Sequence, residues 1–218
     1  MRYVLSLLIG ILAFAVAGAQ TSVDQYVSID FPGVPTKVDN VAQGIPMRTL
    51  TLRTDTAIYV AMRMELEKAK RDKNILPGDT ADLHRIYKGY LNGMDSTIKA
   101  NGIVLRGTQF FIRDSLHWVR TYFERTEDGV RFGENNAVLL GNQLYAFSYY
   151  NFNGFEKGQK TAFLRTVRFA KEHPAQFSGM SGEERKGYLF GKLIGYAVIG
   201  AGILFLVFRK RKGASAGV

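Results

Sequence analysis

The chain has 218 residues and a mass of 24.4 kDa, a length that fits one domain with short terminal segments. It has no cysteine and only three histidines, which excludes a disulfide scaffold, a thiolate zinc site and a cysteine nucleophile. The net charge of +10 would suit a nucleic-acid partner, but six of the basic residues lie in or beside two apolar terminal segments. The remaining excess is small, so we expect no nucleic-acid binding.

Residues 1–19 have the three parts of a secretory signal peptide. Arg2 gives a positive start, residues 3–17 form an apolar run, and Ala17 and Ala19 place small side chains before the cleavage point. An uncleaved anchor helix is the alternative. Because so short a helix does not reach across a ~30 Å hydrocarbon core, we predict cleavage before Gln20.

Residues 20–169 are predicted to form the exported domain, which opens with strands. Residues 27–31 alternate between apolar and polar side chains, the period-two pattern of a half-buried strand, and a Pro-Gly-Val-Pro sequence ends it. The same alternation predicts strands at 47–53 and 58–64.

A long helix is predicted after the Pro77-Gly78 turn. Asp79 or Thr80 can cap its first backbone N–H groups, and the Asn101-Gly102 pair is a suitable end. Apolar residues recur at spacings of three and four, which predicts that one face packs on a sheet. These residues are Leu83, Ile86, Tyr87, Tyr90, Leu91, Met94 and Ile98.

A meander of strands is predicted from residue 103 to 151, with hairpin turns at 113–115, 127–129 and 141–142. A closing helix is predicted over 155–169. Its expected inward residues are Phe155, Ala162, Phe163 and Val167. Three strands, a helix, a strand meander and a helix predict an α+β fold, in which an antiparallel sheet forms an α/β/α sandwich.

The order of these elements resembles a known family. The opening strand ends in Phe-Pro-Gly-Val-Pro (31–35), and a late Gly-Asn-Gln-Leu-Tyr-Ala-Phe-Ser-Tyr strand (141–149) leads into the final helix. Over residues 24–169 the chain is similar to the PsbP-like α/β/α sandwich, which is shared by a photosystem II extrinsic subunit, a nuclear Ran-binding factor and exported bacterial proteins. The resemblance implies non-catalytic docking onto larger assemblies. It supplies no catalytic signature, and a fold alone does not establish a function.

The C-terminal part is predicted to anchor the chain. Residues 170–187 are rich in polar and charged side chains and suit a flexible stalk, whereas 188–208 form an apolar span with Lys192 as its only charge. The basic tail at 209–218 stays inside by the positive-inside rule. We therefore expect a single-pass cell-membrane protein with its N-terminal domain outside, in the periplasm or the extracellular space, and its tail in the cytoplasm. A buried core helix is the alternative.

Small residues line one side of this span. Gly191, Gly195 and Gly202 form a possible dimer face, because missing side chains let two helix backbones approach closely. A homodimer through the membrane helix is therefore one expected assembly.

The sequence predicts no catalytic residue, no cofactor and no metal site. The residue types of a Ser-His-Asp catalytic triad occur together at Asp114, Ser115 and His117. These residues are neighbours at one turn, whereas the members of a catalytic triad converge from separate elements. No histidine has a second one at ligand spacing.

A group of aromatic and arginine residues in the meander is the candidate partner surface. Aromatic residues and arginine are enriched at protein interfaces, although a sheet face buried in the core is the competing interpretation. The residues are Arg113, Trp118, Arg120, Tyr122 and Arg125. We expect a non-catalytic, membrane-tethered extracytoplasmic binding or scaffolding domain, with another envelope protein as partner. The alternatives are a carrier of an apolar ligand between helix and sheet, and an enzyme with a dispersed site.

Overall fold

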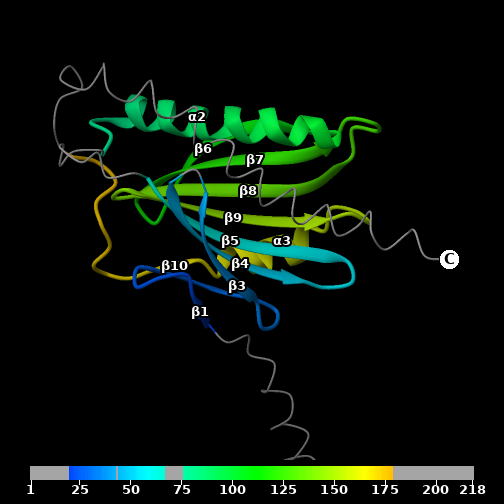
Figure 1. Cartoon of the computed structure of the whole chain (residues 1–218), viewed down its shortest axis with the longest axis horizontal. Helices are drawn as coiled ribbons and strands as arrows, with labels where there is room; N and C mark the ends of the chain where they lie inside the picture. The colour runs from blue at the N-terminus through cyan, green and yellow to red at the C-terminus, as the bar shows by residue number, and fades with distance from the viewer. Residues whose placement is uncertain (1–19, 43, 67–75, 179–218) are drawn as a thin grey trace, which may run out of the picture.

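The computed structural model describes residues 20–42, 44–66 and 76–178 (Figure 1). Seven antiparallel strands form the main sheet in the order β3-β4-β5-β9-β8-β7-β6. Their bounds are β3 Thr36–Ala42, β4 Ile45–Arg53, β5 Ala57–Glu65, β6 Ile103–Arg113, β7 Leu116–Arg125, β8 Arg131–Leu140 and β9 Gln143–Asn151. The β6–β9 meander confirms the predicted run of hairpins, and its last strand, β9, pairs with β5 and so joins the meander to β3, β4 and β5.

A second, three-stranded antiparallel sheet has the order β1-β2-β10. Its strands are β1 Gln20–Ser22, β2 Val27–Asp30 and β10 Arg168–Phe169. The predicted opening strand is β2, whose Val27 and Ile29 are buried while Ser28 and Asp30 are partly exposed. The alternation was therefore a correct guide to the strand, but it carried no information on which sheet the strand joins.

Helix α2 (Thr80–Ile98) covers one face of the main sheet. The Asp79 carboxylate accepts a hydrogen bond from the Asp82 backbone N–H at 2.8 Å, which confirms the predicted cap. Every residue of the predicted apolar stripe is buried. The helix passes into the short 3₁₀ helix η2 (Lys99–Asn101), and Gly102 ends it with φ 72°, a left-handed conformation that glycine adopts without strain.

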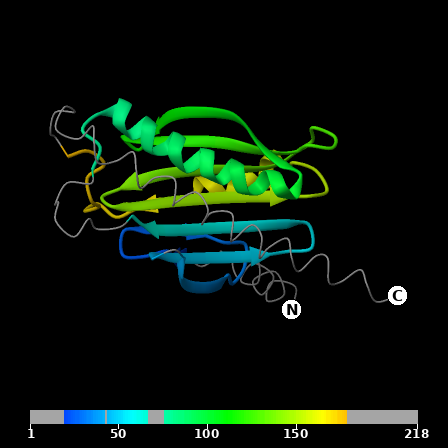
Figure 2. The ribbon, with the colours of Figure 1, turned by 45° about the horizontal axis from the view of Figure 1, so that its top comes forward.

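Helix α3 (Lys157–Arg165) and the small sheet cover the opposite face. In Figure 2, α2 lies across the strands in front and α3 lies behind them. The ring of Phe163 packs on Phe31 of the β2 end and on Tyr59 of β5, with centroids 5.2 and 5.1 Å apart. The sheet therefore has two separate apolar cores, one on each face.

The closing helix is shorter than predicted. The prediction covered 155–169, but α3 ends at Arg165 and the chain enters β10 at Arg168. The hydroxyl of Thr166 donates to Phe163 O at 2.7 Å and accepts the Asp30 backbone N–H at 3.0 Å, so it ties the helix end to β2. Ala162, expected to face inward, is exposed, because Phe163 and Leu164 are the residues that α3 buries.

Strand β3 was not predicted. It lies at one edge of the main sheet, and residues 36–41 are all exposed. A strand with solvent on both faces has no reason to alternate apolar and polar residues, so the pattern that finds half-buried strands does not find it.

The segment after β10 packs on the domain. The Gln176 side chain is buried, accepts the His117 backbone N–H at 2.8 Å, and donates to the carbonyls of His117 and Leu139 at 2.8 and 3.1 Å. These contacts bridge β7 and β8. Residues 170–178, which we predicted as the start of the stalk, are therefore held against the domain.

Several predictions lie outside the described residues. They are the signal peptide, stalk residues 179–187, the membrane span with Gly191, Gly195 and Gly202, and the basic tail. Within the part of the chain that the structure describes, no helix is both long enough and apolar enough to cross a bilayer.

Candidate binding site

A pocket of about 420 Å³ lies between α3 and the main sheet. Strands β6 to β9 supply its floor, and α3 with Val167, two residues beyond the helix end, supplies its wall. The sheet contributes Phe111, Arg113, Trp118, Arg120, Glu134, Asn136 and Phe147. The other side contributes Lys160, Thr161, Leu164, Arg165 and Val167. This volume falls in the ~300–1,000 Å³ range of small-molecule sites.

The alternation of the strands explains why these residues meet. Arg120 of β7 lies opposite Asn136 of β8, and Asn136 lies opposite Phe147 of β9, so the three form one row across the sheet. Phe111 and Trp118 form the adjacent row. Since side chains of directly paired residues lie on the same face, β6 to β9 all present these residues toward α3.

Glu134 is the buried carboxylate of the pocket, with its residue only 1% exposed. Its Oε2 atom accepts a hydrogen bond from Lys160 Nζ at 2.8 Å. Its Oε1 atom lies 3.1 Å from Arg120 Nε and accepts a hydrogen bond from Asn136 Nδ2 at 3.1 Å. Both oxygens are thus committed, which is the condition under which a buried charge is tolerated.

Arg113 connects the floor to the end of α3. Its guanidinium donates to the carbonyl oxygens of Leu164, Arg165 and Val167 at 2.8, 3.2 and 3.0 Å. The carbonyls at a helix end have no partner within the helix and carry partial negative charge. Arg113 therefore satisfies these groups and fixes the height of α3 above the sheet.

Two buried tyrosines support α3 from below. The Tyr59 and Tyr149 hydroxyls donate to Gln159 Oε1 at 3.3 and 3.1 Å. Burial raises the pKa of both tyrosines, so the hydroxyls remain protonated donors at neutral pH. The helix that carries Lys160 and Arg165 is thus positioned by hydrogen bonds as well as by Phe163.

Aromatic rings form the apolar part of the pocket. Phe111 and Trp118 stack with centroids 6.1 Å apart, and Phe147 lies beside Trp118 at 6.0 Å. The Arg120 guanidinium lies 4.6 Å from the Phe111 ring centroid, a cation–π distance. The pocket therefore combines fixed positive charge with apolar walls.

The structure brings together three of the five residues predicted for the partner surface. Arg113, Trp118 and Arg120 line the pocket. Tyr122 is outside it, beneath the Arg131 guanidinium, whose carbon lies 3.8 Å from the ring centroid. Arg125 is held in the β7–β8 turn by Asp128, at 2.9 Å from Nη2 to Oδ2. The predicted set is thus divided between a pocket and a hairpin end.

Sequence reasoning missed the residues that complete the pocket. Glu134 and Asn136 lie in β8, where every residue but the first is buried, so no alternation marked them as distinct. Lys160 and Arg165 lie on α3, and from the sequence alone the charged residues of this helix are typical of a face exposed to solvent. A buried glutamate on a strand becomes noticeable only once its basic partners are placed.

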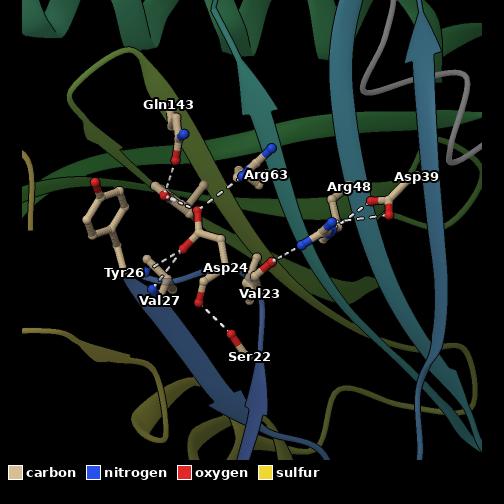
Figure 3. Close-up of polar contacts among 10 residues, drawn as sticks. Ser22, Val23, Asp24, Tyr26, Val27, Asp39, Arg48, Arg63 and Gln143 are labelled. Carbon is tan, nitrogen blue, oxygen red and sulfur yellow. Dashed lines mark hydrogen bonds and ion pairs between the residues drawn. The ribbon is translucent and has the colours of Figure 1, made fainter.

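A second polar cluster surrounds Asp24, at the small sheet (Figure 3). The Asp24 carboxylate accepts the Tyr26 and Val27 backbone N–H groups at 2.8 and 3.0 Å, and the Tyr145 hydroxyl at 2.6 Å. Its Oδ2 lies 3.5 Å from Arg63 Nη1. These bonds join the β1–β2 turn to β5 and β9, so we assign the cluster a structural role.

Among the residues that the structure describes, no group of three or more histidine, aspartate or glutamate side chains is arranged to hold a metal ion. The Glu134 cluster has a single carboxylate whose neighbours are cations, which repel a metal ion rather than bind it.

Comparison with known proteins adds no family. No family model matches the chain, and no curated protein matches it. A crystal structure of a Bacteroides thetaiotaomicron VPI-5482 protein is similar at a TM-score of 0.30 and 9% identity, over 71% of this chain. The match spans 50% of that protein, so the chain corresponds to about half its length. A likeness this distant carries no argument about function.

Proposed function

We propose that the exported domain is a non-catalytic binding domain and that the pocket between α3 and the main sheet is its binding site. The observation that carries this proposal is the pocket itself, which joins fixed cations to aromatic walls at one place on the surface. The side chains around it are suited to holding a group. Glu134, the one carboxylate of the pocket lining, has both oxygens bound to neighbouring side chains.

The membrane tether is part of the proposal and is supported by sequence alone. What supports it is a leader-like start, one apolar segment and a basic tail, a pattern typical of a domain held outside the cytoplasm. Protease added to spheroplasts should digest the domain and leave only a short C-terminal fragment. A protected full-length chain would show that the domain faces the cytoplasm.

The PsbP-like relation is likewise a proposal at the level of architecture. What supports it is the order of elements, a sheet with α2 on one face and α3 on the other, and the turn at 31–35. The docking role that the resemblance implies is compatible with a pocket that receives a group from an envelope partner.

The binding proposal is tested by photo-crosslinking in native membranes. A photoreactive benzoylphenylalanine is placed at Thr161, which lines the pocket, and in a control at Lys157, an exposed residue one turn earlier on α3 that does not line it. We expect an adduct of defined mass, small molecule or protein, from position 161 and none from position 157. Equal capture from both positions, or none from either, would contradict the proposal.

A further inference from the structure

We infer that the ligand of this pocket is a small amphipathic carboxylate, with its carboxylate on the basic side chains and its apolar body against the aromatic wall. The inference rests on the proposed function and deepens it, because it names the chemical class that the site takes.

The charge of the pocket selects an anion. Four basic side chains line it, Arg113, Arg120, Lys160 and Arg165, against the single carboxylate of Glu134. A site with several cations and one fixed anion favours a ligand that brings negative charge. A wholly apolar ligand would remove water from these cations without offering them a hydrogen bond or an opposite charge, which costs free energy.

Donors for such an anion are still free. Arg120 uses Nε on Asn136 and Glu134, and within the described residues its two terminal amino groups have no protein partner. In the same part of the chain the exposed Arg165 guanidinium makes no ion pair or hydrogen bond. A planar guanidinium with two free N–H groups matches the two oxygens of a carboxylate.

The remaining wall fits an apolar body. Phe111, Trp118 and Phe147 lie on the floor, and Leu164 with Val167 lie beside α3. The cavity of about 420 Å³ has room for a ring or a short chain attached to the acid group. An inorganic anion would leave this apolar surface uncovered, so the combination favours an organic acid.

The chain contains its own reporter. Trp118 is the only tryptophan and lines the pocket, so its fluorescence changes when a ligand enters. The full chain in uncharged detergent is titrated with phenylpropanoate and with compounds of matched body and different head, namely phenylpropanol, phenylpropylammonium and phenylpropyl phosphate. We expect saturable binding of phenylpropanoate, and binding at least about tenfold weaker for the alcohol and the amine, because a charge-assisted hydrogen bond is lost.

Two variants assign the effect to the pocket. Arg165→Gln removes a cation that makes no ion pair among the described residues, and should weaken phenylpropanoate about fivefold while leaving phenylpropanol unchanged. Arg53→Gln removes the same charge from the exposed end of β4, which does not line the pocket, and should change neither. Arg120→Gln should weaken phenylpropanoate further. If that variant does not fold, Arg165→Gln alone decides.

Each outcome separates the inference from the proposed function. If the alcohol binds as well as the acid, the pocket binds ligands without reading charge, and only the inference fails. Tighter binding of the phosphate by tenfold or more overturns the carboxylate assignment in favour of a phosphate head. If no compound binds while Thr161 still captures a partner, the inference fails and the binding domain stands. The absence of both signals ends both claims.

Discussion

The two faces of the main sheet differ in how a helix covers them and in the charge of the side chains beneath it. Beneath α2, a helix of 19 residues covers a continuous apolar core, and the polar side chains that the described strands bury there are uncharged. On the other face α3 has only nine residues and leaves part of β6 to β8 uncovered by helix, and there the charged residues gather. A long helix thus makes one face a structural core. A short helix, held by Arg113 and Gln159, leaves room for a site.

The largest expected effect is on stability, and it comes from a substitution in the core beneath α2. Leu83→Ala removes a fully buried side chain from the core beneath α2 and should lower the free energy of unfolding by about 2–5 kcal/mol. Because Leu83 is remote from the pocket lining, phenylpropanoate affinity should not change. Urea unfolding and Trp118 fluorescence measure the two quantities. A loss of binding in a variant that remains folded would mean that the two faces are coupled.

Substitution on the α3 face should separate stability from binding. Glu134→Gln removes the charge that Lys160 and Arg120 share, and should destabilise the domain by about 1.5–3 kcal/mol. The same change frees positive charge, so phenylpropanoate should bind more tightly. Calorimetric titration and urea unfolding test the opposed signs. The isosteric amide keeps the shape of the site, and weaker binding would show that Glu134 holds the pocket geometry.

A substitution in residues 170–178 tests whether this segment contributes to the stability of the domain. Gln176→Ala removes hydrogen bonds to the backbone of His117 and Leu139, and should cost about 1–3 kcal/mol, because buried backbone groups lose their partners. Lys171→Ala, at an exposed position of the same segment, is the matched control and should be neutral. Equal unfolding midpoints for the two variants would indicate that residues 170–178 add nothing to the domain.

The smallest expected effect is a pH dependence of stability that arises from His84 on α2. His84 stacks on Phe110 at 3.8 Å, and burial, with smaller effects of His117 and Lys88, lowers its pKa from 6.5. The unfolded chain then binds the proton more readily than the folded one, so this contribution to stability is present above pH 6.5 and is lost as pH falls below it. The difference in unfolding midpoint between the wild type and His84→Phe should be constant above pH 6.5, and the wild type should lose stability relative to the variant as the pH falls toward 5. Parallel profiles would exclude His84 as the source.

The elements that could be predicted from the sequence are those with one buried face or with clear turn residues. The α2 stripe could be predicted because a half-buried helix repeats its apolar residues at the period of its geometry. The β6–β9 hairpins could be predicted because turn residues separate their strands. Strand β3, which is exposed on both faces, has no such period. The extent of α3 is set by tertiary contacts of Thr166 and β10, which local pattern does not contain.

The site could be predicted only in part for a similar reason. Arg113, Trp118 and Arg120 were noticed because they lie close in sequence, on one hairpin. Their partners Glu134 and Lys160 are distant in sequence and meet them only through the pairing of β7 with β8 and the return of α3. Arg125 was grouped with them by proximity in sequence, but its side chain is bound to Asp128 at the hairpin end.

The claim that one face is structural and the other binds is tested most directly by amide hydrogen exchange of the full chain with and without saturating phenylpropanoate. Exchange should slow in peptides of α3 and in the parts of β7 and β8 that line the pocket, with α2 unchanged. Slower exchange in α2, or a uniform change across the domain, would contradict the account.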